Sequence, residues 1–219
     1  MNRRIFFSLL GGAATSLAAN PTPIRLLMLG DSQAKIPAGG KPLADLMKDR
    51  LAARAYQAEV INRGVAGQTS TMGLATLGKE LAAAKPDLVA LQFGVADAGL
   101  DPKVRSKPLV TPAKFKSNLR QMVKQVEKAR NVPMLFTPVR PVSGPQPTEA
   151  DKKLDERLQP YVQAVREVVR EDGVILIDVY RAFERSTLQG PLTNGTALLA
   201  KGQEEIAMRI AERILVMRM

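Results

Sequence analysis

Apolar stretches of strand length alternate with amphipathic stretches of helical period along most of the chain. Short apolar runs predict β-strands at residues 24–29, 58–62, 88–93, 134–137 and 174–177. Apolar positions at three- and four-residue spacing predict helices at about residues 41–55, 71–84, 112–130, 150–171 and 201–217. Strands that alternate with helices are typical of βαβ units. The pattern therefore predicts an α/β protein with a five-stranded parallel sheet.

Residues that begin or end helices support these boundaries. Thr111 followed by Pro112 is an N-cap with proline at the first helical position, and Lys85-Pro86 ends the preceding helix. Gly173 closes the helix before the fifth strand. Two connections, residues 98–110 and 140–148, are longer than a βα unit requires. Because both follow strands, they either flank a ligand site at the carboxyl edge of the sheet or are surface insertions.

The first 19 residues have the pattern of an export signal. Arg3 and Arg4 precede an uncharged stretch that is too short to span a bilayer, and small residues follow at 18–19. The adjacent arginines are compatible with either the twin-arginine or the general secretory route. We therefore expect residues 1–19 to be a signal peptide, and residues 24–219 to form one exported, periplasmic or secreted bacterial domain without stable membrane insertion.

Positive charge characterises the chain before and after removal of this segment. Losing Arg3 and Arg4 lowers the formal charge by two, from +11 to +9. A basic surface favours anionic partners, but only 4% of the residues are aromatic, so we expect no nucleic-acid binding. Four cations recur at four-residue spacing on one predicted helix and indicate a solvated face: Lys116, Arg120, Lys124 and Lys128.

The sequence contains neither cysteine nor histidine. Disulfide bonds, thiolate or imidazole metal ligands, a cysteine nucleophile and an imidazole base are therefore all excluded from these 219 residues. Any metal would need oxygen ligands, and we expect neither a cofactor nor a metal site.

Glycine-containing turns follow the first three predicted strands. The first strand leads into Gly30-Asp31-Ser32, the second into the segment 62–70 with an Asn-x-Gly-x-x-Gly turn, and the third into the segment 93–97. The carboxyl ends of parallel strands meet at one edge of the sheet, where a helix N-terminus can stabilise negative charge. This arrangement brings the Ser32 hydroxyl to that edge.

Taken in order, these blocks resemble the SGNH/GDSL hydrolases over about residues 24–217. The resemblance implies a flavodoxin-like three-layer α/β/α sandwich and the hydrolysis of ester or acetyl groups on carbohydrate or lipid. It assigns Ser32 as the nucleophile, and the backbone N–H groups of Ser32 and Gly67 as two of three oxyanion donors. The implied partner is a small-molecule, glycan or lipid ester.

Three positions depart from the family pattern. Ala96 stands where the family has the asparagine that supplies the third oxyanion donor. In the block before the last helix, Asn194 stands at the position of the catalytic acid and Ala197 at that of the histidine. Loss of triad members costs serine hydrolases about 10⁴ to 10⁶ in rate, so we expect little or no activity.

Other residues give weak support for a substitute base. Lys201 lies beyond the serine at the start of the last helix, Asp97 is placed to hydrogen-bond the backbone of its own turn, and Asp178 has no partner that the sequence identifies. Three interpretations remain: an esterase that has lost most or all activity, an active esterase with an unusual base, and a basic envelope protein that binds an acylated glycan or another anionic ligand without catalysis.

Overall fold

The computed structural model describes residues 23–31, 41–104, 106–141, 148–184, 193–194 and 197–217; for 193–194 and 197–198 it describes the backbone only. Ser32 and the predicted signal peptide lie outside these ranges. Within them, no helix is long and apolar enough to cross a membrane.

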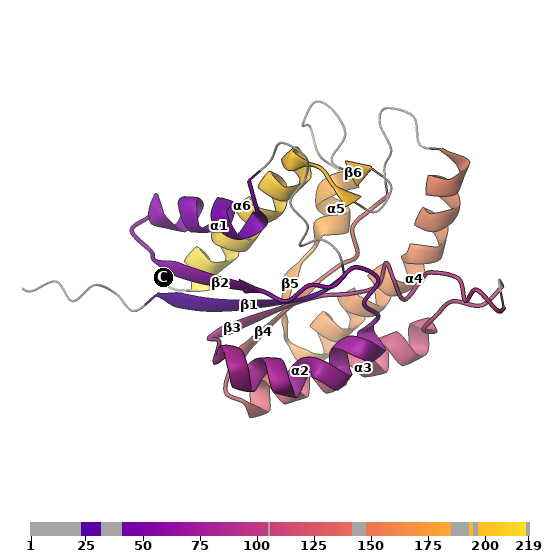
Figure 1. The fold of residues 1–219 in the computed structure, drawn as a ribbon, viewed down its shortest axis with the longest axis horizontal. Coiled ribbons are helices and arrows are strands. Elements are labelled where there is room, and N and C mark those ends of the chain that lie inside the picture. The colour runs from indigo at the N-terminus through magenta and orange to yellow at the C-terminus, as the bar shows by residue number, and fades with distance from the viewer. Residues whose placement is uncertain are drawn as a thin grey trace, which may run out of the picture.

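The centre of the protein is a five-stranded sheet in which every pair of neighbours is parallel (Figure 1). The strand order is β2-β1-β3-β4-β5, which is the flavodoxin-like order. This confirms the predicted fold class. The strands are β1 Ile24–Gly30, β2 Ala58–Asn62, β3 Leu88–Gln92, β4 Val132–Phe136 and β5 Ile175–Ile177.

Helices cover both faces of the sheet, giving the three layers (Figure 1). Helices α1, α5 and α6 pack on one face, and α2, α3 and α4 pack on the other. The helices are α1 Leu43–Ala52, α2 Ser70–Ala84, α3 Pro112–Lys128, α4 Glu149–Asp172, α5 Val179–Glu184 and α6 Ala200–Met217.

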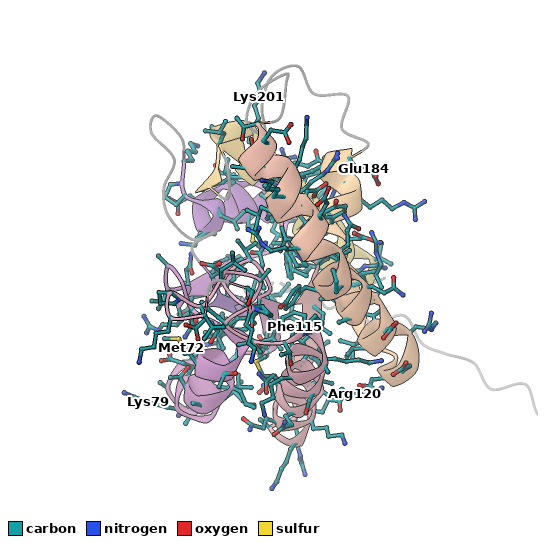
Figure 2. All side chains as sticks on the ribbon, turned by 90° about the vertical axis from the view of Figure 1, so that its right-hand side faces the viewer. Met72, Lys79, Phe115, Arg120, Glu184 and Lys201 are labelled. Carbon is teal, nitrogen blue, oxygen red and sulfur yellow. The ribbon has the colours of Figure 1, made fainter. Side chains whose placement is uncertain are left out.

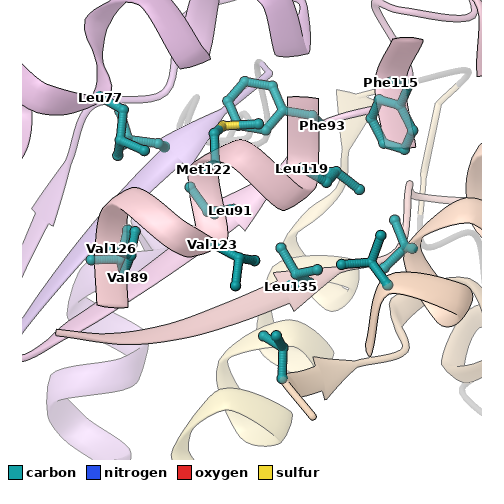
Figure 3. Packing of buried hydrophobic residues seen from close by; sticks show 14 of the residues in the cluster. Leu77, Val89, Leu91, Phe93, Phe115, Leu119, Met122, Val123, Val126 and Leu135 are labelled. Carbon is teal, nitrogen blue, oxygen red and sulfur yellow. The ribbon is translucent and has the colours of Figure 1, made fainter. Parts of the chain in front are cut away.

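Each face of the sheet has its own apolar core. Figure 3 shows the core beneath α3, where Leu119 and Met122 of the helix lie over strand residues such as Leu91 and Leu135. All four side chains are fully buried. Because β3 is covered by helices on both faces, its residues before Gln92 are all apolar and show no alternation.

The cationic face of α3 is only partly exposed in its first half, where it borders α4. Lys116 forms ion pairs with Glu167 and Glu171 of α4, and Arg120 pairs with Glu171 and Asp172. Figure 2 shows Arg120 where α3 borders α4. Lys124 and Lys128, farther along α3, are exposed. The sequence pattern identified the polar face of α3 but not the acidic helix beside it.

The structure also contains elements that periodicity did not predict. Helix α5 has only six residues, too few to show a helical repeat, and two two-residue strands, β6 Thr193–Asn194 and β7 Ala197–Leu198, pair antiparallel. Strand β4 begins two residues before the predicted start, because Pro133 occupies a sheet position although it lacks an N–H. Most of the connection 140–148 lies outside the described residues.

Candidate active site

The ends of β1 and β3 meet at the carboxyl edge of the sheet. Gly30 pairs with Gln92 in the parallel register, and the Asp31 N–H donates to the Gln92 carbonyl at 3.0 Å. Gly30 has a φ of +148°, and a Cβ there would lie 1.8 Å from the Gln92 oxygen. Only glycine fits this position. The main chain therefore leaves β1 along a fixed path into Asp31, the residue before Ser32.

The turn after β2 is fastened to the same edge. Asn62 Oδ1 accepts the Gly64 N–H at 2.9 Å, and the Val65 N–H donates to the Gly30 carbonyl at 2.9 Å. Thr69 then caps α2, its hydroxyl accepting the Met72 N–H. These bonds hold the Asn-x-Gly-x-x-Gly segment against the end of β1, as the sequence predicted for neighbouring parallel strands.

Gly67, the predicted oxyanion donor, lies in this turn with a φ of +75° and is exposed. Its backbone N–H donates to Oδ1 of Asp31 at 2.9 Å. Asp31 itself is buried, with 7% of its surface exposed. The Gly67 donor thus lies beside the residue that precedes Ser32, but in this structure it is directed at a carboxylate.

The turn after β3 carries Ala96, whose methyl group is half-buried and can donate no hydrogen bond. The turn is closed by the Ala98 N–H, which donates to the Gly94 carbonyl, and by the Gly99 N–H, which donates to the Ala96 carbonyl. These bonds fix the backbone of the turn at Ala96, which supplies no side-chain donor.

Asp97 is fully buried and binds the backbone, as expected from the sequence. Its carboxylate accepts the Ser70 N–H, the Ser70 hydroxyl at 2.5 Å and the Gly94 N–H at 3.1 Å. Asn118 in turn donates to the Ser70 hydroxyl. Burial raises the pKa of Asp97, while these hydrogen bonds oppose the rise. Asp97 joins the third turn to α2 and is too enclosed to act as a base.

The sequence identified no partner for Asp178, but the structure shows several. Arg166 of α4 donates two hydrogen bonds to its carboxylate, at 3.0 and 3.2 Å, and Thr137 donates a third. The Arg181 N–H also donates to Asp178, which therefore caps the short helix α5. Asp178 directly after the fifth strand, a residue type favoured at helix N-caps, is the local signal that could have revealed α5.

The last block is described only by its backbone. Asn194 and Ala197 face each other as partners in the β6–β7 pair, and α6 begins three residues after Ala197. Lys201 lies in the first turn of α6 (Figure 2). In the described part of the chain, no three acidic, histidine or cysteine side chains are grouped so that they could hold a metal ion.

The strand order and the helical layers define a flavodoxin-like α/β/α protein. A lipase/acylhydrolase from Enterococcus faecalis superposes with a TM-score of 0.73 and 26% identity, over 87% of this chain and 95% of that one. An acetylxylan esterase from Geobacillus stearothermophilus superposes with a TM-score of 0.71 and 21% identity, over 87% and 94%, which shows a shared fold.

Sequence comparison assigns the family. The profile of the GDSL-like lipase/acylhydrolase family matches residues 28–196, more than half of the chain, so the protein belongs to the SGNH/GDSL hydrolases. An arylesterase from Vibrio mimicus is 33% identical over 135 residues, covering 58% of this chain and 61% of that protein. The esterase TesA from Pseudomonas aeruginosa is 33% identical over 106 residues, covering 48% and 49%. The chain thus spans only half to three fifths of these relatives' length.

Proposed function

We propose that this protein binds an ester of a carbohydrate or lipid at the carboxyl edge of the sheet and hydrolyses it weakly or not at all. The observation that carries the proposal is the absence of histidine from a chain whose family fold and strand-end turns are in place. Family membership supports an ester as the ligand. The absence of the family histidine, acid and asparagine limits the rate of hydrolysis.

The family reaction needs a group to take a proton. When the serine hydroxyl attacks the carbonyl carbon of an ester, its proton must pass to a base, and the carbonyl oxygen gains negative charge that N–H donors stabilise. Asp97 is buried and bound to Ser70, and Asp178 is bound to Arg166. Neither acid is available as a substitute base. Ser32 would therefore attack without help from either of these two acids.

The oxyanion donors are also weakened. Ala96 supplies no side-chain donor, and a missing donor costs about 10² to 10³ in rate. The Gly67 N–H is bound to Asp31, so an oxyanion would have to compete with that carboxylate. What supports binding is the fixed edge of the sheet, where the hydrogen bond from the Val65 N–H to the Gly30 carbonyl holds the two turns together.

The relatives indicate the ligand class. The similar proteins are named arylesterase, esterase and acetylxylan esterase, which act on esters. We infer a small acyl ester, on a glycan or a lipid, as the ligand for this chain. We also propose export through removal of residues 1–19, leaving residues 24–219 as the folded domain. N-terminal sequencing of protein secreted by a bacterial host would test this, and an intact Met1 would contradict it.

Activity is tested with p-nitrophenyl acetate and a fluorophosphonate probe on the wild type and on Ser32→Ala. We expect both proteins to give the same low rate and no covalent labelling. A Ser32-dependent rate or label well above background would show an active esterase with an unusual base. Binding of an acetylated oligosaccharide that survives Ser32→Ala would favour the non-catalytic binding role.

The site assignment is tested by restoring the family residues. The triple variant Ala96→Asn, Asn194→Asp, Ala197→His should hydrolyse esters at least about 10²-fold faster than the wild type. This is the lower estimate for one restored oxyanion donor. A matched variant with Ala197→Gln in place of Ala197→His should not gain it. Adding Ser32→Ala to the triple variant should abolish the gain. A folded triple variant without activity would show that these positions do not form the site.

A further inference from the structure

A groove of about 510 Å³ lies along β5, which is the edge strand at the other end of the sheet from β2. It is bounded by β5, by α5 and by the last turns of α6. In the strand order, β3 and β4 separate β5 from β1, whose end carries Asp31. The groove is therefore distinct from the strand-end turns of the candidate active site, and a ligand bound there does not depend on the proposed esterase function.

Three arginines from two helices line this groove: Arg181 of α5, and Arg209 and Arg213 of α6. Arg209 is neutralised by Glu205, which accepts from Arg209 Nε at 2.8 Å. Arg213 donates to the Leu176 carbonyl, at 3.5 Å. Across the described ranges, neither Arg181 nor Arg213 forms an ion pair with a carboxylate.

The acidic groups of the groove do not offset these two cations. Asp178 is already bound by Arg166, which lies outside the groove. Glu212 remains as a single negative charge in the lining. Two unpaired arginines against one glutamate leave an excess of positive charge. Guanidinium groups bind phosphate oxygens through paired N–H donors, and a tetrahedral phosphate can present oxygens to two arginines at once.

The rest of the lining is apolar. Leu176 and Ala182 form part of the wall, and Val216, with 65% of its surface exposed, lies at the end of α6. The volume is within the range of small-ligand sites. A phosphate carried on an aliphatic body would place its charge at the arginines and its carbon chain along these residues.

We propose that this groove binds a phosphate group attached to an aliphatic body, either a soluble alkyl phosphate or the headgroup of an anionic lipid. Arg181 and Arg213 hold the phosphate, and the apolar wall contacts the carbon atoms next to it. Inorganic phosphate, which lacks the aliphatic part, binds more weakly than an alkyl phosphate.

The test measures binding of octyl phosphate and inorganic phosphate to the full chain by calorimetry. The double variant Arg181→Gln, Arg213→Gln should weaken octyl phosphate binding at least about tenfold, as expected when charge-assisted hydrogen bonds are lost. The control Lys79→Gln, Lys124→Gln removes the same charge from exposed positions on α2 and α3, across the sheet, and should change affinity less than about twofold on the same basis. Thermal unfolding verifies that both variants are folded.

A second arm distinguishes the source of the phosphate. Vesicles of phosphatidylglycerol in phosphatidylcholine are compared with vesicles of phosphatidylcholine alone by sedimentation. Vesicle binding that depends on Arg181 and Arg213 identifies a lipid headgroup, whereas binding of octyl phosphate alone identifies a soluble ligand. Equal losses in the test and control variants, or no binding by the wild type in either arm, would overturn the proposal.

Discussion

The backbone N–H of Gly67 donates a hydrogen bond of 2.9 Å to Oδ1 of Asp31, which lies 36 positions earlier in the chain. This bond joins the turns that follow β1 and β2. It also occupies the N–H group that the family resemblance predicts as an oxyanion donor.

Asp31→Ala should expose the Gly67 amide to solvent exchange. Loss of a hydrogen bond that contributes about 1 kcal/mol corresponds to exchange roughly fivefold faster. Asp31→Asn keeps an oxygen acceptor and should give a smaller change. Amide hydrogen exchange measured by NMR checks this, with the Val65 amide, which donates to the Gly30 carbonyl, as internal reference. Unchanged Gly67 exchange in Asp31→Ala would show that the bond does not persist in solution.

Asp97→Ala should be among the most destabilising substitutions on the carboxyl side of the sheet. It leaves the Ser70 and Gly94 N–H groups buried without an acceptor, at a cost of about 3 kcal/mol. Asp101→Ala is the matched control, because Asp101 accepts N–H groups in an exposed turn of the same connection. Urea unfolding of the two variants measures the difference. Similar losses would mean that Asp97 is more accessible to water than its burial indicates.

Two tyrosines should make the protein less stable in alkali. Burial raises the pKa of both Tyr161 and Tyr180 to about 12. The charge of Asp97 adds to the rise at Tyr161, and the hydrogen bond to Asp155 adds to the rise at Tyr180. Between pH 10 and 12 the unfolded chain loses these protons while the folded protein keeps them. The free energy of unfolding therefore falls as pH rises through that interval.

The double variant Tyr161→Phe, Tyr180→Phe should show a shallower fall over the same interval. Lysines titrate in both proteins, so their contribution cancels in the comparison. Urea unfolding at a series of pH values provides the two curves. Parallel curves would contradict the assignment of these two phenols.

The contact between α3 and α4 should depend on its apolar residues more than on its ion pairs. Glu171→Gln removes pairs with Lys116 and Arg120 that are partly exposed, and should cost less than about 1 kcal/mol. Leu119→Ala, in the buried face of α3, should cost about 3 kcal/mol. Unfolding at low and high salt separates the two effects, since only the first is screened. A larger loss in Glu171→Gln than in Leu119→Ala would reverse this ranking.

Local rules were enough to predict most of the elements. The strand positions followed from apolar runs, and the helices that begin at Ser70, Pro112 and Glu149 followed from periodicity, with Thr111 marking the start of the second. Where prediction failed, the competing cause was local as well: α5 is shorter than two helical turns, and Pro133 obscured the start of β4.

The sequence by itself determined which catalytic side chains are available, because a chain without histidine cannot form the family triad, whatever its fold. It also determined the α/β pattern, because burial on both faces of a parallel sheet requires apolar strands between amphipathic helices. Only the tertiary structure decided which groups meet. The bond from Gly67 to Asp31 and the pairing of Asp178 with Arg166 each join residues on different elements, and the groove beside β5 brings together arginines from α5 and α6. Such contacts depend on strand order and helix packing, which hydrophobic periodicity does not encode.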